Sequence, residues 1–528
     1  MTLSRRGFLR GASGALGLFG ATAAMNKVLG GDAFAATLSG YSGYRALVTV
    51  FLLGGNDSNN LLVPLSSNGS TGPYDRYLSA RPNVGLKTAS NELLPVSPIG
   101  QAAGSYGIHY RMPKLKALFD DLKAAFVLDV GPLVEPLRKA DYAGTVAQKP
   151  ENLFSHSDQQ DAWASAIANP GTAALPPELV GLGPTGWGGR AADRIAPIQT
   201  GTYPEVVILG GKALFGSGGA TSALTMGGSG QFGLTATSDA AFNQVRDEAL
   251  DEILTFTNGQ ALEEVYGQTT SSAIAHSEQR KAARDAAWSL LEVATRNEIN
   301  EAFGATTTDG AALPMTDGSL LGQVYQVIRD IIAGATPAAS GGLGLRRQMF
   351  SVGLGGFDTH VGQRAAQDGL LAQLDDAIGA FQGAMDALAA SSAFGAAPPQ
   401  ATLFTMSDFG RTLVENSDGG TDHAWGSHVI VVGSRVMGQK LIGAFPNLDL
   451  SNGGAQNEDT TDSRGRWIPQ ICVEQLANTF AYWLGATSSA DRAYMFPNLA
   501  GFVAAATAGA FPAHTKSYRF TGSLMMAD

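Results

Sequence analysis

The stretch Ala46-Leu-Val-Thr-Val-Phe-Leu-Leu53, which runs directly into Gly54-Gly-Asn-Asp57, decides the fold. Its apolar and β-branched residues follow one another without polar alternation, which is typical of a strand buried on both faces. The two glycines end this strand and open a loop, so Asn56 and Asp57 lie at its carboxyl end. A strand buried on both faces requires a sheet covered by helices on both sides, which predicts an α/β fold.

The same alternation of strand and helix recurs along the chain. Apolar β-rich runs predict further strands at 124–130, 348–354, 401–406 and 428–432. Helical spacing of apolar residues predicts helices at 112–122, 370–388 and 471–484. We therefore expect a mostly parallel sheet sandwiched by helices.

The composition changes between the two halves of this pattern. A Gly/Ser/Thr-rich stretch at 210–233 precedes a long helical segment from Asp239 to about Ile332, and a Pro/Gly/Ala linker follows at 337–344. The simplest interpretation is a helical insertion at about 237–345.

The first residues have the features of an export signal. Ser4-Arg-Arg-Gly-Phe-Leu9 is a twin-arginine signature, a weakly apolar stretch follows at 11–24, and Ala33-Phe-Ala35 resembles a cleavage site. We therefore expect a signal peptide at 1–36, a mature domain at 37–528, and a periplasmic or extracellular location. No later run approaches the roughly 18 apolar residues of a membrane-spanning helix, so no membrane span is predicted.

Charge and cysteine content narrow the class of protein. The predicted signal peptide carries four basic residues and one acid, so its removal lowers the net charge from −11 to −14. Such an acidic chain is a poor partner for nucleic acid. The single cysteine, Cys472, cannot form an internal disulfide and is expected to be a buried small hydrophobe. Stability must therefore come from a large apolar core.

Polar residues follow several of the predicted strands. In open α/β sheets the carboxyl ends of the strands meet at one edge, where their loops form a crevice. The candidates that could meet there are Asp57, Asp358, His360, Asp408, Asp422, His423 and His428. Several carboxylates in one crevice repel one another unless a cation lies among them, and histidine with carboxylate is a usual ligand set for zinc or manganese. We therefore expect these residues to bind a divalent metal.

Each candidate also has a structural interpretation. Asp57 could cap the turn after Gly54-Gly55, and Asp408 could cap a turn while pairing with Arg411. Asp422 and His428 could orient a ligand without binding the metal themselves. Three other histidines are not assigned to a site: His276, in Ala-His-Ser-Glu, is interpreted as a solvated helix residue, and His109 and His514 have no polar cluster around them.

Six short motifs occur in an order that resembles a known family. They are Phe51-Leu-Leu-Gly-Gly-Asn-Asp57, Ser155-His156, Gly186-Trp-Gly-Gly-Arg190, Phe357-Asp-Thr-His360, Ser407-Asp-Phe-Gly-Arg-Thr412 and Gly420-Thr-Asp-His423. This set resembles the exported family called domain of unknown function 1501, which is similar in fold to the alkaline phosphatase and sulfatase superfamily. The resemblance implies an alkaline phosphatase-like sheet, one or two divalent cations, and a hydroxyl nucleophile that attacks a phosphate or sulfate ester.

The resemblance also suggests roles for individual residues. Asp57, Asp358, His360, Asp408 and His423 match metal-binding positions of the superfamily. Two departures put a second metal in doubt. Phe409 stands where the Asp-His pattern of the superfamily expects histidine, and the spacing from Asp358 to His360 is shorter than usual.

The candidate nucleophile is Ser155, with Ser157 as its rival. His156 could orient the Ser155 hydroxyl or accept its proton. Arg190 and Arg411 could bind the oxygens of an anionic substrate as a fork, although each could equally form a structural salt bridge.

These features predict an exported metal-dependent hydrolase of phosphate or sulfate esters that uses a serine nucleophile. Its substrate would be a small anionic ester or a sulfated or phosphorylated polymer. Two alternatives remain open: a non-catalytic binding or assembly protein of the cell envelope on the same fold, and direct attack of water without a covalent step. The sequence does not specify the substrate, the oligomeric state or the role of the helical insertion.

Overall fold

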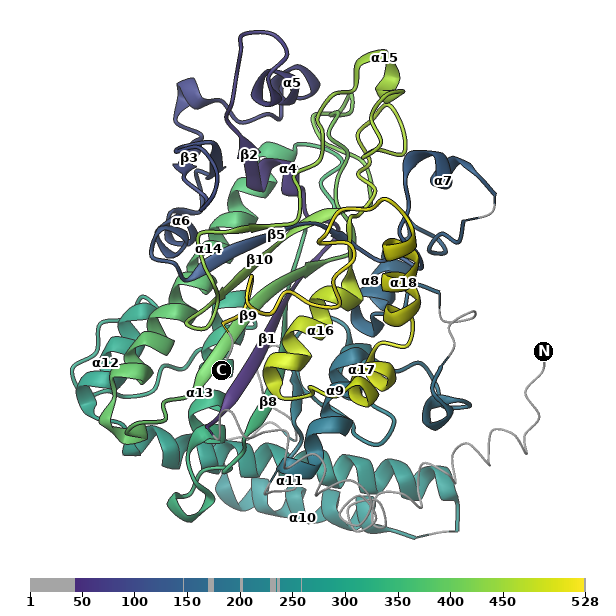
Figure 1. The fold of residues 1–528 in the computed structure, drawn as a ribbon. Helices are drawn as coiled ribbons and strands as arrows, with labels where there is room; N and C mark the ends of the chain where they lie inside the picture. Colours follow the sequence, from purple (N-terminus) through teal and green to yellow (C-terminus); the bar gives the residue numbers. More distant parts are fainter. Residues whose placement is uncertain are drawn as a thin grey trace.

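A nine-stranded mixed sheet forms the centre of the molecule (Figure 1). The computed structural model describes residues 43–145, 147–169, 175–199, 203–227, 234, 238–257 and 259–526. The predicted signal peptide, residues 1–36, lies outside the described residues. Helices pack on both faces of the sheet, which confirms the predicted α/β class.

The strands follow the order β11 (Leu441–Ile442), β5 (Ala124–Gly131), β10 (Ser427–Gly433), β9 (Gln400–Ser407), β1 (Arg45–Leu53), β8 (Arg347–Gly355), β6 (Val206–Ile208) and β7 (Leu224–Thr225), and β12 (Ile471–Cys472) also pairs with β5. All pairs are parallel except those of β10, which runs antiparallel to both β5 and β9. The sheet is therefore mixed, and β10 is the strand that departs from the parallel arrangement that the sequence predicts.

The direction of β10 has a simple cause. The chain leaves the carboxyl end of β9 and enters β10 through residues 408–426, without a helix that would carry it back to the other edge of the sheet. Antiparallel neighbours need no crossover, whereas parallel ones do. The whole 408–426 loop therefore stays at the edge where β9 ends.

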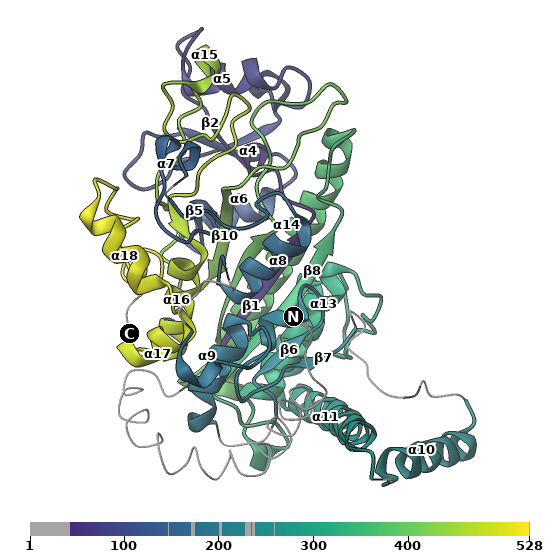
Figure 2. The ribbon, with the colours of Figure 1, turned by 90° about the vertical axis from the view of Figure 1, so that its right-hand side faces the viewer.

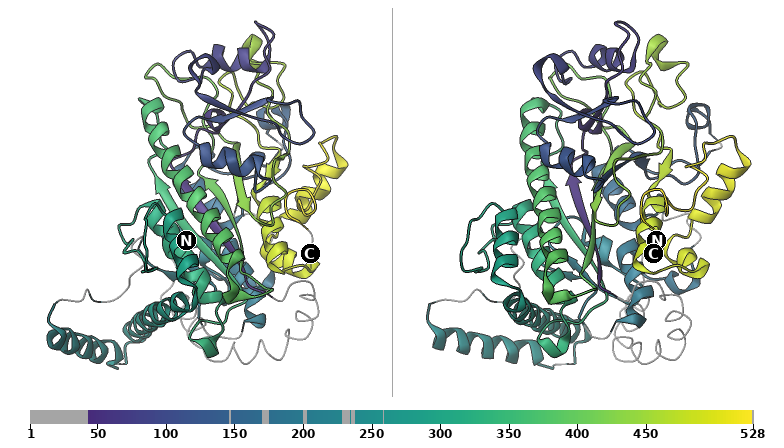
Figure 3. Two further views of the ribbon diagram at one scale, coloured as in Figure 1. Left: turned by 90° about the vertical axis from the view of Figure 1, so that its left-hand side faces the viewer. Right: turned by 60° about the vertical axis from the view of Figure 1, so that its left-hand side comes forward.

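The side chains of β1 alternate between two apolar cores. Val48 and Val50 enter one core, and Leu47 and Phe51 enter the other. The first core packs against α6 (Pro113–Asp120), α13 (Leu320–Ala335) and α14 (Gln363–Ala390), and the second against α8 (His156–Ser165), α9 (Trp187–Ile195) and α16 (Val473–Leu484). The helices thus form layers on both faces of the sheet (Figure 3). Cys472 is buried in the second core, as predicted.

Smaller elements surround this frame. A three-stranded sheet has the order β2 (Leu62–Pro64), β4 (Tyr106–His109) and β3 (Leu93–Val96). The remaining helices of the described chain, apart from short 3₁₀ turns and the two of the next paragraph, are α4 (Ser58–Leu61), α5 (Pro73–Ala80), α7 (Lys139–Ala143), α12 (Val293–Ala302), α15 (Ser451–Gly454), α17 (Ser489–Met495) and α18 (Leu499–Ala508). None of the helices in the described ranges is both long and apolar enough to cross a membrane.

The predicted helical segment contains an arm that extends away from the sheet (Figure 2). It consists of α10 (Ala240–Thr255) and most of α11 (Ala261–Leu290). Arg280 of α11 forms a buried ion pair of 2.7 Å with Asp330 of α13, which itself packs on β8. This pair fixes the base of the arm to the body of the protein.

Strand β5 contains a bulge at Asp129. This residue has a φ of +52°, and the pairing register with β10 shifts beside it. Its side chain is buried, and neither carboxyl oxygen has a hydrogen-bond partner among the described residues. Burial, with a further contribution from Asp459, raises the pKa of Asp129 well above its usual value. We infer that this carboxyl group is neutral in the folded protein over a wide pH range.

Asp129→Asn tests this inference. Because the folded pKa lies above the unfolded one, ionisation opposes folding, and the penalty grows as the pH rises above about 4. We expect the variant to match the wild type near pH 4 and to exceed its free energy of unfolding at pH 8 by at least ~1.4 kcal/mol. Urea unfolding across this pH range measures the difference. Asp247→Asn, at an exposed position of α10, is the control and should show no such trend; a difference at Asp129 that is independent of pH would refute the inference.

Candidate functional site

Three loops meet where β1, β8 and β9 end (Figure 1). The loop after β1 contains Gly54, the loop after β8 contains Asp358, and the loop between β9 and β10 contains Arg411. Gly54 has a φ of +116°, and a Cβ atom there would lie 2.4 Å from the backbone nitrogen of Asp358. Glycine is therefore required for the first two loops to touch.

The buried Arg411 side chain ties these loops together. Its guanidinium group donates to the carbonyl oxygens of Gly54 (2.8 Å), Gly55 (2.9 Å), Phe357 (3.1 Å) and Thr421 (2.8 Å), and it also pairs with the carboxylate of Asp358. The guanidinium group is thus occupied by protein acceptors. This leaves it a positioning role, and the structure does not support the expectation that it binds a substrate anion.

Three histidines and one aspartate converge in front of Arg411, and we call His156, Asp358, His360 and His423 the imidazole cluster. The Nε2 atoms of His360 and His423 are 3.0 Å apart. Asp358 Oδ1 lies 3.0 Å from the first and 3.2 Å from the second, and its Oδ2 lies 3.4 Å from His156 Nε2. One ligand atom each from His156, Asp358 and His423 lies within 4.8 Å of the others.

The opposite ring nitrogens are each held by an acceptor. His156 Nδ1 lies 2.6 Å from Asp408 Oδ2, His360 Nδ1 lies 3.2 Å from Asp422 Oδ1, and His423 Nδ1 lies 2.9 Å from the Phe154 carbonyl oxygen. A carbonyl oxygen or a carboxylate can only accept, so a proton on Nδ1 satisfies each of these three contacts. The Asp358 carboxylate faces the Nε2 atoms as an acceptor as well, and a bound cation would take the place of a proton on Nε2. In the neutral rings, every Nε2 lone pair then faces the centre of the cluster.

This arrangement suits a cation. Two imidazole lone pairs and a carboxylate oxygen within 3.2 Å of one another repel unless protons on Nε2 or a cation lie between them. Ligand atoms around a tetrahedral zinc ion are roughly 3.3 Å apart, because each lies about 2.0 to 2.1 Å from the metal. Four separations in the cluster, 3.0 to 3.4 Å, are close to this value, and the ligand atoms of His156, Asp358 and His423 all lie within 4.8 Å of one another. Carboxylate partners on the far ring nitrogens are also usual for metal-binding histidines.

The electrostatic environment favours the metal-binding forms of these side chains. Burial lowers the pKa of His423 and so opposes protonation of its Nε2. Burial opposes ionisation of Asp358, but the hydrogen bond and charge of Arg411 outweigh it and lower the pKa of this carboxyl group. The pKa of Asp422 is lowered in the same way, since Asn416, His360 and Arg464 outweigh its burial.

Phe409 forms an apolar support under the cluster. Its buried ring lies 4.9 Å from the ring centroid of His156 and 4.4 Å from that of His423. The side chain that departs from the superfamily pattern therefore packs against two imidazoles. It offers no ligand for a second cation.

Asp57 and His428 are occupied elsewhere, although the sequence grouped them with the metal ligands. Asp57 caps α4 and forms a buried ion pair with Arg81, whose Nη1 and Nη2 lie 2.5 and 2.9 Å from its carboxylate oxygens. Gln363 also donates to it. His428 Nδ1 accepts from the Asp129 backbone N–H at 3.1 Å, and burial lowers the pKa of this ring to about 3. Asp57 is therefore a cap with a buried ion pair, as its structural interpretation predicts, and His428 is a neutral core residue.

Asp408 and Asp422 each contact one imidazole ring of the cluster from behind, and their own carboxylates do not face its centre. The carboxylate of Asp408 is completely buried and also accepts from Gln160 Nε2 (2.9 Å) and the Gly54 backbone N–H (3.2 Å). Asp422 accepts from Asn416 Nδ2 at 3.2 Å. Each fixes the ring orientation of one histidine.

Ser155 is next to His156 in the chain, but its hydroxyl is engaged by other residues. The hydroxyl donates to the Asp158 carboxylate and lies 3.2 Å from Ser157 Oγ. Both ring nitrogens of His156 are committed, one to Asp408 and the other to the cluster. His156 therefore has no nitrogen left to accept the Ser155 proton.

Arg190 is a structural residue. It is fully buried in α9 and donates to the carbonyl oxygens of Met495 (2.9 and 2.7 Å), Thr185 (2.8 Å) and Ser165. The expectation that it binds a substrate anion has no support in this geometry.

Sequence reasoning missed several groups around the cluster. The Phe154 carbonyl oxygen holds His423, and Gln160 donates to Asp408, which holds His156. Arg464 and Arg466 approach from a loop about 40 residues beyond His423. Backbone acceptors leave no signature in a sequence. The closely spaced pair Arg464-Gly-Arg466 could have indicated an anion-binding segment, but only the fold shows that it lies near the site.

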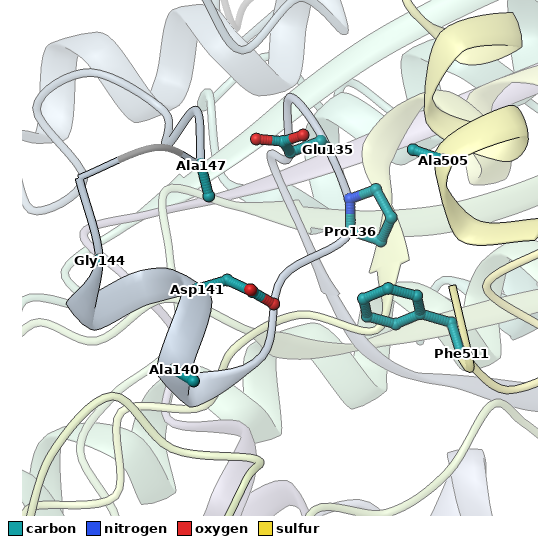
Figure 4. A pocket seen from close by; sticks show the side chains of 8 residues that line it. All are labelled: Glu135, Pro136, Ala140, Asp141, Gly144, Ala147, Ala505 and Phe511. Carbon is teal, nitrogen blue, oxygen red and sulfur yellow. The ribbon is translucent and has the colours of Figure 1, made fainter. Parts of the chain in front are cut away.

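A surface pocket lies apart from the cluster (Figure 4). It has a volume of about 500 Å³ and is lined by the segment that follows β5 and by α18 and Phe511. None of the cluster residues lines it. The cluster is instead open to solvent at its own edge, where the side chains of Asp358 and His360 are 46% and 41% exposed.

The ring orientation makes a prediction for His423. Because a carbonyl oxygen cannot donate, we expect the neutral His423 ring to carry its proton on Nδ1 in the metal-free protein near pH 8. Long-range ¹H–¹⁵N correlation spectra of histidine-labelled protein distinguish the two tautomers, and a His423→Gln variant assigns the signals. A proton found on Nε2 would contradict the proposed orientation of the lone pair toward the cluster.

The comparisons with known proteins find similarity to one family over part of the chain. No curated protein and no solved structure matches the sequence. Residues 216–460, a little under half of the chain, match the model of a family described as protein of unknown function (DUF1501). The match includes Asp358, His360 and His423 of the cluster and ends just before the loop that carries Arg464 and Arg466. Over this segment, the chain is similar to DUF1501.

Proposed function

We propose that this protein is a metal-dependent hydrolase of phosphate or sulfate esters with one divalent cation held by the imidazole cluster. The observation that carries the proposal is the convergence of three Nε2 atoms and the Asp358 carboxylate, each ring being oriented by an acceptor on Nδ1. Nitrogen ligands favour zinc, and manganese is the alternative that the carboxylate allows.

The proposed cation would supply Lewis acidity, which polarises an ester oxygen and makes an attacking hydroxyl group more acidic. The chain supplies the geometry. Asp408 and Asp422 keep the Nδ1 protons of His156 and His360, so that the Nε2 lone pairs stay free. Arg411 holds Asp358 in place, and the rigid loops maintain the spacing of the ligands. Fixed ligands lower the reorganisation needed during the reaction.

The contacts of Ser155 favour water over serine as the nucleophile. The Ser155 hydroxyl is engaged by Asp158, and His156 cannot serve as its base. Ser155 remains the alternative nucleophile, because it lies between His156 and Phe154, which both contact the cluster. In that case Asp158 would have to accept its proton.

One observation favours a second candidate function. If His360 joined His156, Asp358 and His423 on one ion, four protein ligands would complete a tetrahedral shell, which is typical of structural metal sites, whereas catalytic zinc sites keep a position open. A cation bound by all four side chains could stabilise a non-catalytic binding or assembly protein. Against this, the ligand side chains are 22% to 46% exposed, so a substrate can reach the cluster.

The alkaline phosphatase-like arrangement and export remain part of the proposal. The α/β sheet with the cluster at the carboxyl ends of its strands agrees with such a fold. The twin-arginine signature around Arg5 and Arg6 still predicts an exported protein, with hydrolysis occurring in the periplasm or outside the cell.

Zinc binding by ligand variants tests the proposal. We expect the wild type to bind one Zn²⁺ per chain. His156→Ala, His360→Ala and His423→Ala should each weaken binding by more than the roughly 10- to 100-fold loss that follows removal of an outer partner of a ligand. Titration calorimetry and elemental analysis measure the stoichiometry and affinity. Turnover of 4-nitrophenyl phosphate and 4-nitrophenyl sulfate by the zinc-loaded and manganese-loaded protein measures activity.

His276→Ala is the matched control, because this partly exposed histidine of α11 lies outside the cluster. It should bind zinc like the wild type. Loss of turnover in Ser155→Ala with zinc retained would identify the serine as nucleophile, and unchanged turnover would support attack by water. A wild type that binds no stoichiometric metal would refute the proposal, and one that binds metal but hydrolyses neither ester would favour the structural role.

A further inference from the structure

The loop at residues 460–467 forms a short hairpin beside the imidazole cluster, and we call it the arginine hairpin. Thr460 and Trp467 form an antiparallel bridge, and the Thr461 N–H donates to the Arg466 carbonyl oxygen at 2.9 Å. The N–H groups of Leu413 and Val414 donate to the hairpin at 3.1 and 3.0 Å. Since Leu413 lies two residues after Arg411, the hairpin is fixed to the loop that positions the cluster.

Arg464 is linked to an imidazole of the cluster through the carboxylate of Asp422. Its Nη1 is 2.5 Å from Asp422 Oδ2, and the other oxygen of Asp422 holds His360 Nδ1. Within the described ranges of the chain, Arg464 forms this one side-chain ion pair, so Nε and Nη2 remain for another acceptor. Its side chain is 34% exposed.

Arg466 approaches the cluster from the side of His423. Its Nε donates to the His423 carbonyl oxygen at 2.8 Å, and its Nη1 pairs with Asp462. The guanidinium carbon lies 5.1 Å from the centre of the Phe154 ring, and the Phe154 carbonyl oxygen holds His423 Nδ1. Arg466 is thus packed between two residues that contact the cluster, with Nη2 free of ion pairs to the described acids.

These two arginines differ from the two that the sequence indicated. Arg190 and Arg411 are completely buried and their donors are occupied by protein acceptors, whereas Arg464 and Arg466 are partly exposed and have donors to spare. A surface ion pair alone contributes little to stability, about 0 to 1 kcal/mol. Stabilisation of the fold therefore does not account well for two arginines at this position. Guanidinium groups are well suited to the oxygens of phosphate and sulfate.

We propose that Arg464 and Arg466 bind the tetrahedral oxyanion of the substrate and so select phosphate or sulfate esters over neutral esters. This inference rests on the proposed function of the cluster. It also assigns the selection of the substrate to a segment beyond the residues that match the family model, 216–460.

Anion binding by hairpin variants tests the inference. The probes are inorganic phosphate and inorganic sulfate, titrated calorimetrically into the zinc-loaded protein. We expect Arg464→Gln and Arg466→Gln each to weaken binding by about tenfold or more, which is the usual effect of losing one charge-assisted hydrogen bond. Arg464→Lys should lie between wild type and Arg464→Gln, because it keeps the charge and loses the fork. The anion bound more tightly identifies the ester class.

Arg346→Gln is the matched control. It removes the same charge from an exposed position just before β8, at the opposite end of that strand from Asp358, and should bind both anions like the wild type. The zinc content of every variant is measured in parallel. Unchanged anion affinity in both Gln variants would overturn the inference, and so would a wild type that binds zinc but neither anion. A wild type that binds no zinc would refute the proposed function itself.

Substrate selectivity gives a second readout. We expect the ratio of kcat/KM for 4-nitrophenyl phosphate or sulfate to that for 4-nitrophenyl acetate to fall about tenfold in the Gln variants. A purely structural role of the arginines would lower the turnover of anionic and neutral esters together and leave the ratio unchanged, which would also overturn the inference.

Discussion

The buried Arg411 side chain is the constraint on which the candidate site depends. Its guanidinium group bonds to the loop after β1, the loop after β8 and the loop between β9 and β10, all of which lie at one edge of the sheet. Removing it would leave several buried carbonyl oxygens without donors, at a cost of about 1 to 3 kcal/mol each. Arg411 also orients Asp358 directly. The same side chain therefore holds the loops together and sets the geometry of the cluster.

The imidazole cluster follows from this joint. Each ring is held on its Nδ1 side by a group far from it in the sequence, namely Asp408, Asp422 and the Phe154 carbonyl oxygen. The rings are thereby pointed at one another with lone pairs and a carboxylate in close approach. Such an arrangement is electrostatically unfavourable without a positive charge at its centre, and this is the physical basis of the proposed cation site.

The sequence predicted the frame of the protein well, because burial on both faces of a sheet leaves continuous apolar runs. The runs at 46–53, 124–130, 348–354, 401–406 and 428–432 all appear as strands. The direction of β10 could not be predicted from the sequence. The residues of the polar loop at 408–426 do not indicate at which edge of the sheet the next strand begins. Near the site, short-range patterns identified acids and histidines but could not separate helix caps from ligands. Asp57 and Asp358 look alike in sequence and differ only in whether Arg81 or the cluster faces them.

By itself, the sequence determined which residue types are available at the carboxyl ends of the strands, because chain order and hydrophobic pattern place the loops there. Only the tertiary structure decided which of them face one another. His156 and Arg466 reach the cluster from segments hundreds of residues apart, and Asp57 and His428 turn away from it to Arg81 and to the Asp129 backbone. Orientation depends on hydrogen bonds to distant side chains and to backbone carbonyl groups, and neither leaves a local pattern in the chain.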